Sequence, residues 1–222
     1  IVVWYKNGEV ESIHDNTYWK ELRILLVLNN IKEKEYSSSD GMLLSKNTSS
    51  LLKYRISHVV DDNMNKIRQY FKDKDFEGVA KITMMDSNSL HAVCLDTFPP
   101  LMYLNESSFF LIKIINHING IFLNKENNGL ILNQKIKCAY TFDAGPNCCI
   151  ITLELYEAKI KRILEIIYNQ SKIKDEENID DYFSEFNMNL KVIEKFQNEV
   201  ILKSFKIENI VSFCVGEGAK LL

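Results

Sequence analysis

The stretch Ile136–Leu155, with the sequence IKCAYTFDAGPNCCIITLEL, decides the class of fold. Its two ends, Ile136–Phe142 and Cys148–Leu155, are strand-like runs of mostly apolar residues. Between them lies Asp143–Asn147, whose glycine and proline are typical of a sharp turn. The stretch therefore predicts two strands on either side of a turn.

The region before the first helix supplies further strands. Trp4–Ile13, interrupted by Asn7-Gly8, predicts two short strands joined by a tight turn, since Asn-Gly suits the positive φ angles of hairpin loops. Glu21–Leu28 predicts a buried strand. Tyr36–Met42 is centred on Ser-Ser-Ser-Asp-Gly, a polar sequence that predicts a loop.

Apolar residues at helical spacing predict helices on both sides of the opening stretch. The expected helices are Ser50–Phe71 as one helix or two, a helix from an N-cap in Asp73–Asp75 to about Leu95, one from near Asn105 to Asn119-Gly120, Ala158–Asn169 and Phe186–Leu202. Asn124–Asn128 predicts a turn, Ser171–Asp181 a mobile surface connection, and Asn209–Val215 a last strand. This order of elements favours an α+β fold with an antiparallel sheet covered on one face.

Composition narrows the classes of function. The 222 residues are 46% apolar and carry a formal net charge of -3, which gives no bulk attraction to nucleic acid. The longest apolar runs are far shorter than the roughly 20 residues of a membrane-spanning helix, so we expect no membrane span. Five cysteines without a CxxC pair favour reduced thiols and a cytoplasmic location. Because the chain begins at Ile1 without an initiator methionine, we expect a longer parent protein.

Two long motifs carry a family resemblance. Asp86–Pro100, DSNSLHAVCLDTFPP, and Ala139–Asn147, AYTFDAGPN, resemble the eukaryotic mevalonate diphosphate decarboxylase family of the GHMP kinase superfamily. Weaker similarity covers Trp19–Arg23, Ser38–Met42 and Val215–Gly218. The resemblance implies a ferredoxin-like antiparallel sheet covered by helices, as in the C-terminal domain of that family.

The resemblance also implies how the protein is divided. Residues 1–18 would be a strand or hairpin that joins an N-terminal domain, and residues 19–222 the GHMP-type C-terminal domain. In the family, the ATP-binding loop, a catalytic arginine and a substrate lysine come from the N-terminal domain, and this sequence contains neither a P-loop nor a dinucleotide motif. ATP and Mg²⁺ would therefore bind mainly outside this chain, which alone would be inactive. The family resemblance implies a homodimer.

The implied reaction is the ATP-dependent decarboxylation of mevalonate 5-diphosphate to isopentenyl diphosphate in isoprenoid and sterol biosynthesis. Asp143 would face the C3 hydroxyl and assist its phosphorylation, as a base or as an orienting group, before phosphate and CO₂ leave. Ala144 and Asn147 would lie beside the substrate, and Ser38 and Ser39 would contact its diphosphate. Some family members carry arginine at the position of Ser39.

The residues taken alone leave structural alternatives open. Asp143 and Asn147 suit Asx-type turn stabilisation, and Ser38 and Ser39 suit a plain polar loop. His91 fits a hydrogen-bonded structural role better than a ligand role, and the four scattered histidines predict no protein-held metal.

Two alternative functions also remain at this point. One is another GHMP small-molecule kinase, which the Asp143 motif and Leu95–Pro100 disfavour. The other is a non-catalytic GHMP-like domain retained for dimerisation or interaction.

Overall fold

The computed structural model describes residues 2–4, 8–29, 36–124, 129–132, 135–169 and 183–216. Its strands are β1 Val2–Trp4, β2 Val10–Ser12, β3 Leu22–Asn29, β4 Ile121–Asn124, β5 Gly129–Leu132, β6 Cys138–Phe142, β7 Cys148–Leu153 and β8 Ile207–Cys214. Its helices are α1 Ser38–Thr48, α2 Ser50–His58, α3 Val60–Asp73, α4 Phe76–Asp96, α5 Glu106–Ile118, α6 Glu154–Asn169, the 3₁₀ helix η1 Ser184–Phe186 and α8 Leu190–Lys203. None of these helices is long and apolar enough to cross a membrane.

The central sheet has the strand order β6-β7-β3-β8, and every neighbouring pair is antiparallel. The opening stretch of the sequence analysis forms β6 and β7, which pair from Cys138 opposite Thr152 to Phe142 opposite Cys148. The predicted pair of strands around a turn is therefore confirmed. In this order β6 is an edge strand, a position that matters for the functional site.

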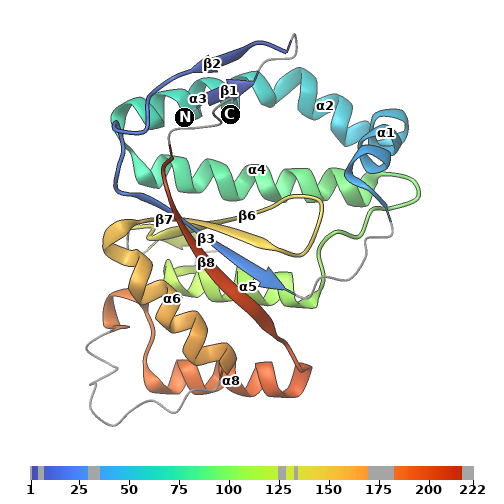
Figure 1. Cartoon of the computed structure of the whole chain (residues 1–222). Coiled ribbons are helices and arrows are strands. Elements are labelled where there is room, and N and C mark those ends of the chain that lie inside the picture. Colours follow the sequence, from blue (N-terminus) through green and yellow to red (C-terminus); the bar gives the residue numbers. More distant parts are fainter. Residues whose placement is uncertain are drawn as a thin grey trace, which may run out of the picture.

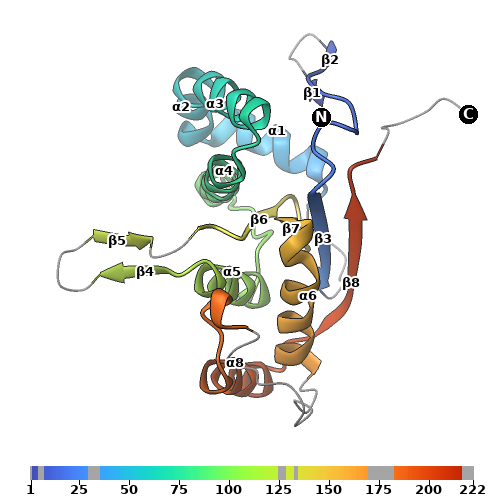
Figure 2. The same cartoon turned by 90° about the vertical axis from the view of Figure 1, so that its left-hand side faces the viewer.

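The hydrophobic core lies between the sheet and the helices on one of its faces. Alternate residues of β3 point into this core, and Leu25 and Val27 are fully buried. They pack with apolar side chains of α5 and α6, among them Ile114 and Ile163. Figure 2 shows α5 and α6 on the same side of the sheet, with no described helix on the other side. The expected α+β fold, with an antiparallel sheet covered on one face, is confirmed.

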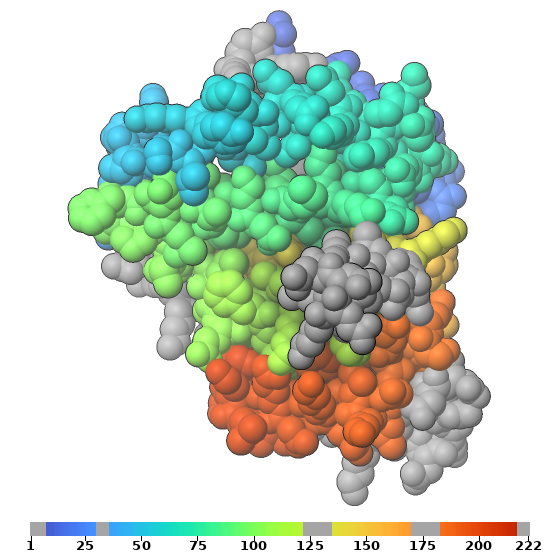
Figure 3. Space-filling view, turned by 180° about the vertical axis from the view of Figure 1, so that it is seen from behind, coloured from blue at the N-terminus to red at the C-terminus, as the bar shows by residue number. Residues whose placement is uncertain are grey.

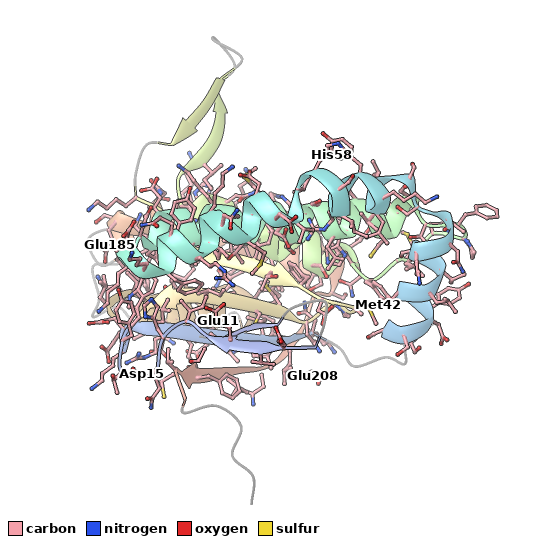
Figure 4. The ribbon with its side chains drawn as sticks, turned by 90° about the horizontal axis from the view of Figure 1, so that it is seen from above. Glu11, Asp15, Met42, His58, Glu185 and Glu208 are labelled. Atoms are coloured by element: carbon pink, nitrogen blue, oxygen red, sulfur yellow. The ribbon has the colours of Figure 1, made fainter. Side chains whose placement is uncertain are left out.

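The helices α1 to α4 form a second group beside the sheet. Helix α4 runs along the β6 edge, and α2 and α3 pack against the outer side of α4 (Figure 1). From the opposite side, α4 and α5 lie next to one another below α2 and α3 (Figure 3). Helix α1, on which Figure 4 labels Met42, lies beyond the ends of the strands. This arrangement brings α4 and α1 to the end of β6.

The N-terminal strands form a separate two-stranded ribbon. β1 and β2 are antiparallel, with Val2 opposite Ser12, which confirms the predicted pair of short strands. An ion pair between Glu11, labelled in Figure 4, and Arg68 of α3 connects the ribbon to the helices at 2.8 Å. Gly8 between the strands has a φ of 85°, as the Asn-Gly sequence predicted.

Several predicted helices are confirmed, including their caps. Ser50–Phe71 forms the two helices α2 and α3. The Asp75 side chain accepts a hydrogen bond from the Gly78 amide at the start of α4. Asn105 and Ser108 form a reciprocal capping box at the start of α5. Gly120 follows α5 with a φ of 63°, in agreement with its expected role at a helix end.

The loop predicted over Tyr36–Met42 is wrong, because α1 begins at Ser38. The Ser37 side chain accepts a hydrogen bond from the Asp40 amide at 3.1 Å and donates one to the Asp40 carboxylate at 2.6 Å. Serine and aspartate at these positions are helix-capping residues, so the polar sequence marks the first turn of a helix.

Smaller differences concern the ends of other elements. The hairpin of β4 and β5 was not predicted, although it flanks the expected turn at Asn124–Asn128, whose last four residues lie outside the described ones. Helix α6 begins at Glu154, four residues before the predicted start, and α8 begins at Leu190. The predicted connection Ser171–Asp181 lies outside the described residues.

Candidate functional site

Asp143 lies where β6 enters the turn toward β7. Its side chain is exposed, whereas Phe142 before it is buried. The Gly145 amide donates a hydrogen bond to the Asp143 carbonyl at 2.7 Å, which closes a tight turn directly after the aspartate. The turn therefore restrains the backbone of Asp143, and the exposed carboxylate is open to a ligand.

The far end of this turn is attached to the core through Asn29, which is 1% exposed at the end of β3. The Asn29 amide donates to the Asn147 side-chain oxygen at 3.0 Å, and the Asn29 side chain donates to the Pro146 carbonyl at 2.9 Å. The Ser108 hydroxyl donates to the same carbonyl at 3.4 Å. Asn147 thus makes a turn-stabilising contact, and a substrate contact by Asn147 or the half-buried Ala144 stays a prediction.

Tyr103 contacts the first turn of α1 and responds to the charge of Asp143. Its hydroxyl donates a hydrogen bond to the Ser37 carbonyl at 3.3 Å. Burial raises the pKa of Tyr103, and the negative charges of nearby Asp143 and Asp40 raise it further. The start of α1 contacts Tyr103 directly, and the charge of Asp143 acts on the same phenol, although 103 residues separate Asp40 from Asp143 in the sequence.

The charge of Asp143 acts on two buried, uncharged groups of α4. Burial lowers the pKa of His91, and its hydrogen bond to the Phe142 carbonyl and the charge of Asp143 oppose that shift. Burial also raises the pKa of the Cys94 thiol, with a smaller contribution from Asp143. Both groups are therefore neutral near pH 7. The exposed Asp143 carboxylate lies beside these groups.

Two cavities flank α4, and Asp143 lines neither of them. One, of about 290 Å³, lies between α4 and the α2–α3 pair and contains the ion pair of Arg55 with Asp86, whose atoms are 2.7 Å apart. The other, of about 240 Å³, is mostly apolar and is lined by His91 and Tyr103 among others. The second cavity thus reaches His91, which contacts the residue before Asp143, and Tyr103, which contacts the start of α1.

The described residues contain no group of three or more histidines, cysteines, aspartates or glutamates that could hold a metal ion. All five cysteines are free. Burial raises the pKa of the Cys138 thiol to about 12, so this thiol is a neutral core group.

A family model described as the mevalonate 5-diphosphate decarboxylase C-terminal domain matches residues 24–222. The chain belongs to this family. Among its relatives, the diphosphomevalonate decarboxylase of Ganoderma lucidum is 36% identical over 217 residues, which are 95% of this chain and 51% of that protein. This decarboxylase-family domain therefore spans about half the length of that relative.

Solved structures have the same architecture as this decarboxylase-family domain. The mevalonate diphosphate decarboxylase from Trypanosoma brucei superposes with a TM-score of 0.72 and 25% identity, over 98% of this chain and 55% of that one. A complex of MDDEF with MVAPP, AMPPCP and magnesium superposes with a TM-score of 0.60 and 25% identity, over 70% of this chain and 43% of that one.

The predicted site residues lie in two places. Asp143, Ala144 and Asn147 share the turn after β6, and Ser38 and Ser39 are exposed on the first turn of α1. Tyr103, which contacts the start of α1, was not predicted as a site residue. Its position just after the Asp86–Pro100 motif was the one signal in the sequence that could have indicated it.

Proposed function

We propose that this chain is the C-terminal half of an ATP-dependent enzyme that decarboxylates mevalonate 5-diphosphate to isopentenyl diphosphate. The observation that carries the proposal is the exposed Asp143 carboxylate on an anchored turn, in a chain that belongs to the decarboxylase family. The relatives that support it are diphosphomevalonate decarboxylases, of which this chain spans about half. Isoprenoid and sterol biosynthesis is the pathway that consumes this product.

In this proposal Asp143 faces the C3 hydroxyl of the substrate. A carboxylate accepts the hydroxyl hydrogen bond and either orients the oxygen or takes its proton during phosphorylation. Because the turn is hydrogen-bonded within itself and to Asn29, the carboxylate needs little rearrangement when the substrate binds. The phosphate on the C3 oxygen then leaves the substrate together with CO₂.

The substrate diphosphate lies, in this proposal, at the first turn of α1. Ser38 and Ser39 present exposed hydroxyl groups there, and unpaired amides at a helix N-terminus attract anions. Asp40 carries a negative charge in the same turn, which opposes the approach of a diphosphate. Binding therefore requires a cation from the N-terminal half or from Mg²⁺.

ATP and Mg²⁺ complete the proposed reaction. A relative binds MVAPP together with AMPPCP and magnesium, which supports the use of a nucleotide and a metal by this family. Mg²⁺ is usually held by substrate phosphates and only one or two carboxylates. ATP supplies the phosphoryl group that activates the C3 hydroxyl, and the residues of this chain position that hydroxyl.

The remaining parts of the proposal concern the partners of the chain. Residues 1–18 join an N-terminal domain that binds ATP, residues 19–222 form the C-terminal domain, and the chain alone is inactive. The complete protein forms a homodimer, and the five free cysteines support a cytoplasmic location.

The test is ATP-dependent CO₂ release from mevalonate 5-diphosphate by the full-length protein that contains this chain. Asp143→Asn keeps the size of the side chain and removes the proton acceptor, and we expect the rate to fall by about 10²–10⁴-fold. Asp62→Asn, on the exposed face of α3, is the matched control and should leave the rate unchanged. Full activity of Asp143→Asn would refute the proposed role of this carboxylate. No activity in the unsubstituted protein would favour a non-catalytic domain.

A further inference from the structure

The backbone of Phe142, one residue before Asp143, has polar groups that no strand satisfies. β6 is the edge strand of the sheet, so every second residue directs its N–H and C=O away from β7. Such outward groups require other partners when they are buried. Phe142 is 3% exposed, and α4 runs along this edge of the sheet, next to β6 (Figure 1).

Two side chains of α4 provide those partners. The Ser87 hydroxyl oxygen accepts a hydrogen bond from the Phe142 N–H at 3.0 Å. The His91 Nε2 atom lies 3.3 Å from the Phe142 carbonyl oxygen, which can only accept, so Nε2 carries the proton and donates. Ser87 and His91 are four residues apart on one face of α4 and are 4% and 8% exposed.

The start of β6 is held in the same way by Asn119, at the C-terminal end of α5. The Asn119 side-chain oxygen accepts hydrogen bonds from the amides of Lys137 and Cys138, at 2.9 and 3.2 Å. The Asn119 side-chain nitrogen donates to the Cys138 carbonyl at 2.8 Å. Asn119 is completely buried, and it holds the end of β6 that is distant from Asp143. The two attachments therefore have equivalent chemistry at opposite ends of one strand.

We propose that Ser87 and His91 are positioning residues that direct the Asp143 carboxylate through the backbone of Phe142. The Phe142 carbonyl belongs to the peptide bond that joins Phe142 to Asp143, so its hydrogen bond with His91 restrains that peptide bond. The hydrogen bond with Ser87 restrains the peptide bond before it. Asn29 and Ser108 hold the other end of the same turn. The backbone that carries the carboxylate is thus held on both sides, and the two attachments on the β6 side come from the long motif Asp86–Pro100.

The inference rests on the proposed function and predicts a specific kinetic effect. Removal of the Ser87 hydroxyl leaves the Phe142 N–H buried without an acceptor, so the peptide shifts toward another partner. A displacement of about 1 Å in a reacting group can reduce the rate by as much as 10²-fold. Because Ser87 does not touch the substrate, the loss falls on kcat, and KM for mevalonate 5-diphosphate stays the same.

The experiment compares four variants of the full-length protein that contains this chain, at a temperature at which all are folded. Ser87→Ala removes the acceptor, and Ser87→Thr retains a hydroxyl at the same position. Asn119→Ala is the matched control, because it removes the equivalent attachment at the other end of β6. Asp143→Asn reports on the proposed function itself. Thermal unfolding of each variant shows how far it is destabilised.

We expect Ser87→Ala to lower kcat about ten- to a hundred-fold without a change in KM, and Ser87→Thr to restore most of it. Asn119→Ala should lower the melting temperature by at least as much and leave kcat within about twofold, because Cys138 is remote from the reacting groups. Equal losses of kcat in Ser87→Ala and Asn119→Ala would overturn the positioning role, as would an unchanged kcat in Ser87→Ala. If Asp143→Asn is inactive and the other three variants keep the full rate, the positioning role fails and the proposed function stands. If Asp143→Asn is fully active, both the proposed function and the positioning role fail.

Discussion

The contact between Gly41 and Tyr103 allows a quantitative test of how α1 is attached to the site. A Cβ atom at position 41 would overlap with the Tyr103 hydroxyl oxygen and lie 3.2 Å from Leu101 Cδ1. Gly41→Ala therefore forces the Tyr103 ring away from α1 and breaks the hydrogen bond to the Ser37 carbonyl.

The expected change follows from three contributions to the free energy of unfolding. Overpacking of this kind destabilises by about 1–3 kcal/mol, and the lost hydrogen bond by about 0.5–1.5 kcal/mol. Alanine is the better helix former by about 1 kcal/mol, which partly offsets both losses. Gly41→Ala should thus destabilise the chain by about 2 kcal/mol, although intrinsic helix propensity alone predicts stabilisation.

The assay is urea unfolding followed by circular dichroism, applied to a double-mutant cycle with Tyr103→Phe. Without the hydroxyl, the new methyl group meets only contacts near 3.2 and 3.3 Å, which small shifts can relieve. Gly41→Ala should then change stability by less than about 1 kcal/mol, so the coupling energy is at least about 1 kcal/mol. A stabilising Gly41→Ala, or the same destabilisation in both backgrounds, would refute the contact as described.

Two further predictions concern pH and the core. Burial lowers the folded-state pKa of His91 and His117 below 6.5, so the unfolded chain takes up protons first as the pH falls. The free energy of unfolding should be constant above about pH 7 and decline below about pH 6.5, toward the folded-state pKa values. Urea midpoints that rise on acidification through this pH range would contradict the prediction. Leu25→Ala, at a position with 0% exposure in β3, should lower the free energy of unfolding by about 2–5 kcal/mol. Leu155→Ala, at a position 65% exposed, should change it by less than about 0.5 kcal/mol, and equal effects in chemical denaturation would disprove this assignment of the core.

The sequence predicted most of the elements because their signals are local. Asn105 caps α5 and Asp75 caps α4 through hydrogen bonds within three residues, so capping chemistry is visible in the order of residues alone. The pattern of apolar residues likewise indicated β6 and β7. The failure at α1 came from reading Ser37 and its neighbours as loop residues, although the same residue types begin helices.

The elements with weak local signals were placed less well. The strands β4 and β5 are four residues long, and only their pairing with each other identifies them. Helix α6 begins directly after β7, where the Glu154 amide donates a hydrogen bond to the carbonyl of Glu21, the residue before β3. Such a boundary depends on a contact across 133 residues, which no local pattern contains.

The candidate site likewise has features that the local sequence predicts and features that only the tertiary structure decides. The sequence alone determined that Asp143 follows a strand and enters a turn, because strand pattern and turn chemistry are properties of neighbouring residues. Only the tertiary structure decided which groups hold that turn. Ser87 and His91 of α4 hold Phe142 directly before the turn, and Asn29 of β3 holds Asn147 at its other end. These contacts arise from the packing of α4 against an edge strand, and packing between elements distant in the chain leaves no periodic trace in the sequence.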